Sequence, residues 1–186
     1  MTVEDIYTHV SSHMVKGLMI HSQLADYYYF LNLEGYACCH EYHFLAESET
    51  YRKFMAHYIK YHHELIPETE IENPDVIPTS WYKYTSMDLD ASTVKTAVQN
   101  GLKKWVDWEK ETKVLYETMY KELLDIGAVS DTIVLKELIE DVSCELRKAE
   151  KYQLNKELIN YDISTIISEQ KTKKDKYKHK IDEIRR

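Results

Sequence analysis

The chain has few of the residues that make turns. Its 186 residues include only four glycines and three prolines, and all three prolines fall within residues 67–78. A β protein of this length needs turn residues spread along the whole chain, so a turn-rich β fold is excluded and long helices are favoured. The length itself fits one domain with a sizeable core.

Cysteine and long apolar runs are also scarce. Cys38, Cys39 and Cys144 are odd in number and two are adjacent, so neither a disulfide framework nor the spacing of a zinc site is present. No apolar run approaches the roughly 20 residues that cross a membrane. The acidic start, Met1–Asp5, lacks the apolar core of a signal peptide. We therefore expect a soluble protein of the reducing cytoplasm with no membrane partner.

Positive charge is concentrated at the end of the chain. The net charge is −8, yet residues 169–186 contain eight basic and four acidic residues, so the remainder carries −12. A body this acidic disfavours nucleic acid as a partner. Only the basic tail could bind nucleic acid, and its interspersed acids would make that binding weak.

Apolar residues recur at helical spacing in four long segments. The predicted helices cover about residues 3–33, 36–65 and 92–126, and a fourth begins near residue 130. Thr2 and Asp5 form a capping box at the first start. The expected inward positions of the second helix are Leu45, Ser48, Tyr51, Met55 and Ile59.

The connections between these segments predict their topology. Gly35 is expected to make a tight turn, Gly127 to end the third helix, and Ser130 or Asp131 to cap the fourth. The long proline-containing stretch 66–91 suits a crossover along the bundle. Short, long and short connections predict an all-α, up-down-down-up four-helix bundle over residues 1–160.

Residues 161–186 form a separate basic segment. Apolar residues keep a helical spacing at both ends, but Gln170 and Lys174 interrupt the stripe. The favoured interpretation is a solvated or frayed C-terminal helix or tail. A docking arm for a partner subunit and a weak nucleic-acid arm are the alternatives.

Glu109 is the most informative residue, because it lies in the middle of the apolar stripe of the third helix. A carboxylate in such a place must be paired, hydrogen-bonded, neutral or bound to metal, since an isolated buried charge is very costly. One interpretation is a structural network of Glu109 with His21, Ser48 and Tyr51. The other is a metal centre.

Several segments resemble the ferritin-like family. Trp108-Glu109-Lys110 through Leu115-Tyr116-Glu117 is similar to its third helix, where the glutamate is a metal ligand. The stretch 138–142 is similar to its fourth-helix segment, and 47–59 to its second-helix segment. His21 falls where the family has its first glutamate. The pattern covers roughly residues 10–155, with few identities.

The resemblance implies a ferritin-like bundle that binds iron or another divalent metal at an altered central site. His21 and Glu109 would be ligands together with one fourth-helix acid. The candidates for that acid are Glu140, Asp141 and Glu145. The family's Glu-x-x-His falls on Ser48 and Tyr51, so Glu47 or Glu49 would serve only if the helix register shifts by one. Ser48, Tyr51 and Glu47 are otherwise expected to lie around the ligands.

A non-enzymatic structural or interaction protein on the same scaffold, without its metal site, is the alternative function. The sequence does not decide whether the protein is an enzyme. The remaining histidines, including the pair 9/13 and the pair 40/43 that shares a helix face with Glu47, are interpreted as solvated or as polar packing, with a metal bridge between subunits as the alternative. Sixteen tyrosines, among them Tyr27–Tyr29 and Tyr82 beside Trp81, predict self-association into a homo-oligomer.

Overall fold

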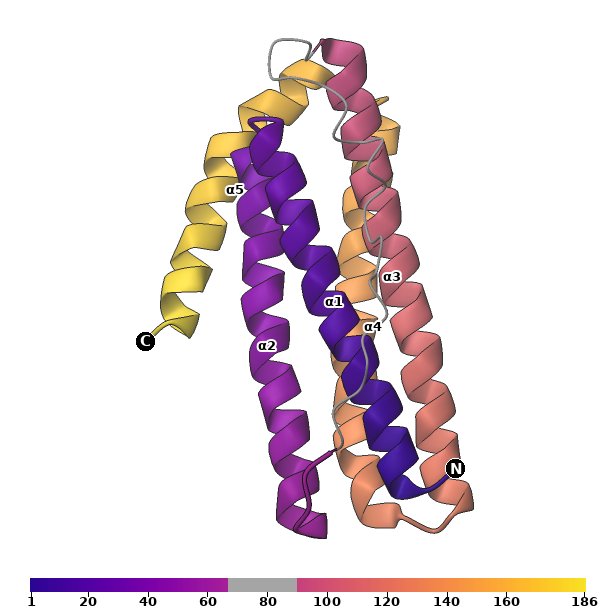
Figure 1. The fold of residues 1–186 in the computed structure, drawn as a ribbon. Helices are drawn as coiled ribbons and strands as arrows, with labels where there is room; N and C mark the ends of the chain where they lie inside the picture. The colour runs from indigo at the N-terminus through magenta and orange to yellow at the C-terminus, as the bar shows by residue number, and fades with distance from the viewer. Residues whose placement is uncertain (67–89) are drawn as a thin grey trace.

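The computed structural model describes residues 1–66 and 90–186, and over these ranges the chain is helical without strands. The helices are α1 (Val3–Phe30), α2 (Glu34–His62), α3 (Ala91–Asp125), α4 (Val129–Leu158) and α5 (Ile163–Ile184) (Figure 1). The all-α prediction is confirmed. None of the described helices is apolar over a long enough stretch to cross a membrane.

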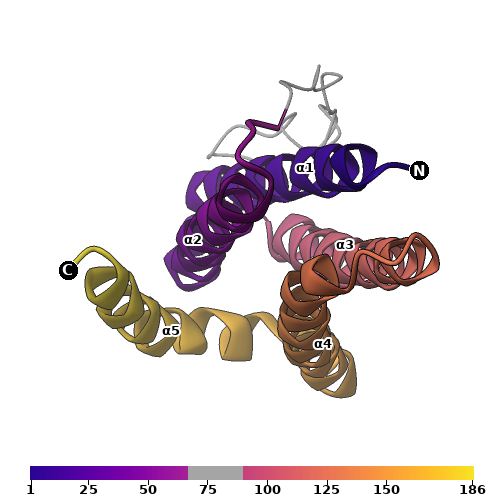
Figure 2. The same cartoon turned by 90° about the horizontal axis from the view of Figure 1, so that it is seen from below.

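Four helices form two antiparallel hairpins. The α1 helix packs on α2 and α3 packs on α4, while contact between α1 and α3 joins the two hairpins. In Figure 1, α1 and α4 run in one direction and α2 and α3 in the other. Viewed along the axis in Figure 2, these helices occupy four corners and α5 lies outside them against α2. Most of the expected crossover, residues 67–89, lies outside the described residues.

The three short turns share one design. Asn32, Gly127 and Asn160 each adopt a left-handed conformation after α1, α3 and α4. The residue after each of them donates its backbone N–H to a carbonyl of the last helical turn, as in a Schellman motif. Gly127 therefore ends α3 as predicted. The turn expected at Gly35 is made by Asn32 instead, because α2 already begins at Glu34.

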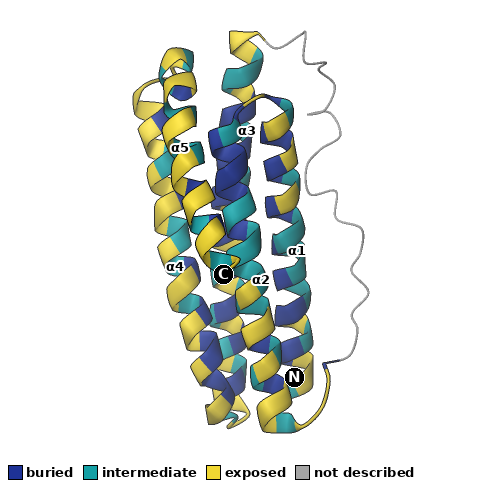
Figure 3. Cartoon of the chain, turned by 90° about the vertical axis from the view of Figure 1, so that its left-hand side faces the viewer, coloured by how far each residue is buried: buried dark blue, intermediate teal, exposed yellow. Residues whose placement is uncertain are grey.

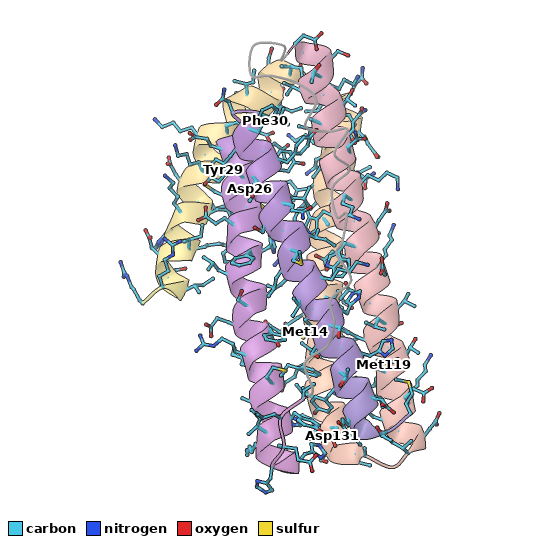
Figure 4. All side chains as sticks on the ribbon, in the orientation of Figure 1. Met14, Asp26, Tyr29, Phe30, Met119 and Asp131 are labelled. Carbon is cyan, nitrogen blue, oxygen red and sulfur yellow. The ribbon has the colours of Figure 1, made fainter. Side chains whose placement is uncertain are left out.

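The capping predictions have different outcomes. Thr2 and Asp5 form the predicted capping box. The prediction for α4 is wrong: its N-cap is Ala128, without a side-chain cap. Asp131 is instead buried, and its Oδ1 accepts hydrogen bonds from Tyr7 (2.9 Å) and His62 (2.8 Å). Figure 4 places Asp131 at the end of the bundle where α2 ends and α4 begins.

The inward faces of α1 and α3 follow the predicted stripes, which are buried from Ile6 to Leu31 and from Val98 to Leu123. Figure 3 shows the buried residues gathered on the sides that face other helices. The predicted face of α2 is wrong by about one residue. Ile59 is 43% exposed, whereas Phe54 and Tyr58 are buried.

The interior of the bundle contains two separate apolar cores. One surrounds Leu24, Leu102 and Trp105 near the α1–α2 turn, and the other surrounds Phe54 and Leu135 near the opposite end. The buried polar residues between them come from the middle of α1, α2 and α3. They include His21, His40, His43 and Glu109. The polar layer between the two cores therefore contains the site expected from the sequence.

The basic C-terminal segment is a packed helix. Ile166, Tyr177 and Ile181 of α5 are buried against the bundle. The two polar residues that interrupt its stripe contact the start of α2. Gln170 Oε1 accepts the backbone N–H groups of Gly35 (2.9 Å) and Tyr36 (3.3 Å), while Lys174 pairs with Glu34. A frayed tail was expected because Gln170 and Lys174 interrupt the apolar stripe, and apolar spacing does not reveal their polar contacts with α2.

Candidate metal centre

A group of three potential ligands lies at the middle of the bundle. His21 comes from α1, Glu47 from α2 and Glu109 from α3, and one donor atom of each lies within 4.8 Å of the other two. In the part of the chain that the structure describes, no other three His, Cys, Asp or Glu side chains meet this criterion. Met14, labelled on α1 in Figure 4, lies on the wall of the adjoining cavity.

His21 directs its Nε2 atom at the two carboxylates. Nε2 lies 3.0 Å from Glu47 Oε1 and 3.9 Å from Glu109 Oε1. The His21 side chain is fully buried, yet Nε2 makes no hydrogen bond of normal geometry with either oxygen. Although burial acts to lower the pKa of His21, the charges of Glu47 and Glu109 raise it above its usual value.

His40 fixes the orientation of the His21 ring. The two Nδ1 atoms lie 2.9 Å apart, so one donates a hydrogen bond and the other accepts it. Burial and the neighbouring charge of His21 hold the pKa of His40 well below its usual value, so His40 is neutral. A neutral His40 can accept from His21 Nδ1–H and leave Nε2 directed into the site.

Glu109 is buried, as its position in the stripe predicts. Its Oε1 accepts a hydrogen bond of 2.9 Å from the indole N–H of Trp105, one turn earlier on α3. Burial, assisted by the charge of Glu47, raises the pKa of Glu109 to about 8. The carboxyl group is therefore largely protonated at neutral pH unless a cation replaces the proton.

A cavity of about 330 Å³ adjoins these residues and is lined by all four bundle helices. Glu145 of α4 lies on its wall, with Oε2 3.5 Å from His43 Nδ1 and without a hydrogen bond. Its Oε1 accepts a hydrogen bond of 2.6 Å from Lys148. Among the fourth-helix candidates, Asp141 is exposed at the cavity wall, and Glu140 is exposed and outside it.

The second helix supplies Glu47 to the group of three. Ser48 donates its hydroxyl to the backbone carbonyl of Phe44, and Tyr51 packs against the apolar core near Phe54. The structure therefore brings His21, Glu47 and Glu109 together without Ser48 or Tyr51. A β-carbon at Gly17 would lie 3.0 Å from Glu47 Oε2, so glycine at this position makes room for the carboxylate.

His40 and His43 are packed polar residues, one of the two interpretations from the sequence, but the sequence interpretation did not place them at the site. Both are buried and stack near His21, with ring centroids 5.2 and 5.3 Å from it. Burial and the charge of His21 hold the pKa of His43 well below its usual value. The available signal was the spacing of residues 40, 43 and 47, which share one face of α2.

The other histidines take polar contacts away from this group. His13 Nε2 lies 2.8 Å from Thr112 Oγ1, and His57 Nδ1 lies 2.8 Å from the hydroxyl of Tyr7. His9 is exposed. Trp81 and Tyr82 lie outside the described residues, so the aromatic patch predicted there stays a prediction.

Comparisons with protein-family models, with curated proteins and with solved structures found no match to the chain. The geometry of the site therefore carries the functional argument.

Proposed function

We propose that this protein binds a divalent metal ion at the centre of its bundle. The observation that carries the proposal is the buried His21 Nε2, which faces two carboxylates and lacks a normal hydrogen bond. A buried polar atom without a well-formed hydrogen bond is costly, and an ion between the three donors would satisfy it. His21, Glu47 and Glu109 would hold the ion, with Glu145 across the cavity as a further donor.

The residues fit such an ion in chemistry and spacing. Metals held by imidazole and carboxylate ligands at about 2.0–2.2 Å bring neighbouring donor atoms to roughly 3–4 Å from each other. The separations of 3.0 Å and 3.9 Å between His21 Nε2 and the two carboxylates agree with this range. One imidazole with several carboxylates and no thiolate suits iron, manganese or zinc. Iron is our first candidate because of the resemblance to ferritin-like proteins.

In this proposal the protein's own residues bind the ion and orient its ligands. His40 holds the His21 ring, and Trp105 holds Glu109 by its indole N–H. The cavity beside Glu109 offers space for a small molecule next to the ion. A redox-active ion such as iron would supply one-electron chemistry there.

A ferritin-like arrangement forms part of the proposal. The helix directions and the two hairpins support it (Figure 1). The ligand set departs from the family pattern, since α1 provides a histidine and α2 provides Glu47 four residues after His43 in place of Glu-x-x-His. We therefore propose an altered metal site on a ferritin-like scaffold.

Metal analysis tests the proposal directly. The protein, purified without a histidine tag, is analysed by elemental mass spectrometry before and after anaerobic loading with ferrous iron. We expect one or two metal ions per chain in the wild type. Glu109→Gln should abolish binding and leave the helical circular dichroism unchanged, because the amide keeps the shape of the carboxyl group and removes its charge.

Two glutamates of α4 provide a matched control. Glu145→Gln changes a cavity residue and should weaken binding, whereas Glu140→Gln changes an exposed residue of the same helix and should leave it intact. Stoichiometric binding retained in Glu109→Gln would reject the proposed ligand set.

The alternative is a structural bundle in which protonated His21 pairs with Glu47, next to a protonated Glu109, and no metal binds. The raised pKa of His21 favours this state in metal-free protein. Under this alternative, Glu109→Leu should be tolerated or stabilising, because packed apolar groups often replace a buried ion pair without loss. A metal-free wild type together with a stable Glu109→Leu variant would favour it.

A further inference from the structure

A second cavity, of about 390 Å³, lies between α4 and α5, and lysine dominates its lining. Lys148, Lys151 and Lys156 come from α4, and Lys173 and Lys176 come from α5. Its one acidic lining residue is Glu169, so the lining carries a net charge of +4 in a chain whose net charge is −8. Such a concentration of positive charge on an acidic protein attracts anions.

The inner part of this cavity contains more positively charged than negatively charged side chains. Lys156 is 3% exposed and donates to both oxygens of Glu169, at 2.7 and 2.6 Å. Lys173 Nζ lies 2.9 Å from the same carboxylate, but without normal hydrogen-bond geometry. One carboxylate therefore faces two ammonium groups, which leaves one charge uncompensated in a largely buried place.

Aromatic rings hold Lys173 in position. Its Nζ lies 4.2 Å from the ring centre of Tyr36 and 4.7 Å from that of Tyr152. Burial lowers the pKa of Lys173, although its contact with Glu169 opposes this effect. The ammonium group is thus held at the cavity and can still donate hydrogen bonds to a ligand.

The outer part of the cavity has lysines available for a ligand. Lys151 and Lys176 are both exposed, and neither forms an ion pair with a described residue. Lys148 is already paired with Glu145. A ligand would therefore meet two solvated lysines at the mouth and Lys173 further in.

We propose that this cavity binds a small polyanion with two or more phosphate groups. Its volume is at the lower end of small-molecule sites, which excludes a large ligand. Lysine ammonium groups bind phosphate oxygens as point charges, and several converging lysines suit more than one phosphate. The site does not depend on the metal proposal, because it shares neither His21, Glu47 nor Glu109.

Calorimetric titration with inorganic pyrophosphate at low ionic strength tests this inference on the full chain. We expect saturable binding of one pyrophosphate per chain. The double substitution Lys151→Gln with Lys176→Gln removes the two exposed lysines and should weaken binding at least tenfold. Both side chains are exposed, so the fold should be unaffected.

A matched pair of substitutions separates this site from general electrostatic attraction. Lys136→Gln with Lys171→Gln also changes one exposed lysine on α4 and one on α5, but neither lines the cavity. Binding in this variant should remain within twofold of the wild type. Equal weakening in both double variants, or no saturable binding by the wild type at millimolar pyrophosphate, would overturn the inference.

Discussion

Glu109 and His21 both favour a bound proton in the folded, metal-free protein. The pKa of Glu109 is raised to about 8 by burial and by Glu47, and the carboxylates around His21 raise its pKa in spite of burial. A group whose pKa is higher in the folded state stabilises the fold at low pH and loses that contribution as pH rises. Metal binding must displace these protons, so affinity should increase with pH.

The first prediction concerns the pH dependence of stability. Between about pH 7 and pH 9, the free energy of unfolding of the metal-free wild type should fall by on the order of 1–2 kcal/mol. Glu109→Gln should show a flatter profile, because glutamine does not titrate. Urea denaturation at several pH values measures both.

The pH range of 7 to 9 matters because the pKa shifts of other histidines have the opposite sign. Burial lowers the pKa of His13 to about 4 and also lowers those of His40 and His43, so these groups stabilise the fold as pH rises toward 6.5. Above about pH 7 they are neutral in both states and drop out. Identical profiles for wild type and Glu109→Gln in that window would refute the assignment, and Glu140→Gln serves as the unchanged control.

Single residues of the site were predictable to different degrees. Glu109 was found because a carboxylate in an apolar stripe is conspicuous, and His21 because it falls at the position of a metal-binding glutamate in the ferritin-like resemblance. The face of α2 carries mixed polar and aromatic residues, so its periodicity allowed two registers. The structure selects the register of His43 and Glu47, and Ser48 lies outside the ligand group.

At the scale of elements, α5 completes the start of α2. The N-cap of α2, Leu33, provides no side-chain hydrogen bond, and Gln170 supplies that acceptor from another helix. A β-carbon at Gly35 would lie 2.6 Å from the backbone oxygen of Gln170, so the close approach requires glycine at that position.

The second prediction follows from this interhelical cap. Gln170→Ala should lower the free energy of unfolding by about 1 kcal/mol, since loss of the capping acceptor leaves the backbone N–H of Gly35 unpaired, whereas the N–H of Tyr36 still donates to the carbonyl of Leu33. Hydrogen exchange should accelerate at the amide of Gly35. Lys171→Ala, at the neighbouring exposed position, is the control and should change neither. Unchanged exchange at the amide of Gly35 in Gln170→Ala would contradict the role of Gln170.

Element prediction from the sequence succeeded where the signal was local. The existence of the four bundle helices, the Thr2 capping box and the end of α3 at Gly127 follow from spacing and backbone preference. The packing of α5 did not follow, because it depends on Gln170 meeting a helix start 135 residues earlier in the chain. A polar contact over that distance leaves no periodic pattern.

At the scale of the whole molecule, the proposed ion would join helices that the chain connects only at their ends. Its ligands come from α1, α2 and α3, with Glu145 of α4 beside them. A ligand that binds only the folded state stabilises it in proportion to the logarithm of its concentration.

The third prediction is therefore a metal-dependent increase in Tm. At a free metal concentration 100 times the dissociation constant, the free energy of unfolding of the wild type should increase by about 2.7 kcal/mol. Differential scanning calorimetry with and without metal measures the change, and Glu109→Gln should show none. An equal increase in both proteins would indicate binding elsewhere on the surface.

The polar layer between the two apolar cores also determines how the helices are aligned along their axes. A helix that slid by one turn, about 5.4 Å, would move its polar groups out of this layer and into hydrocarbon. For α1, that displacement would separate His21 from Glu109 and His40 and leave a buried imidazole without partners. An entirely apolar interior would tolerate such sliding more easily. The same residues that form the candidate metal centre thus select one vertical alignment of the bundle from several that hydrophobic packing alone would accept.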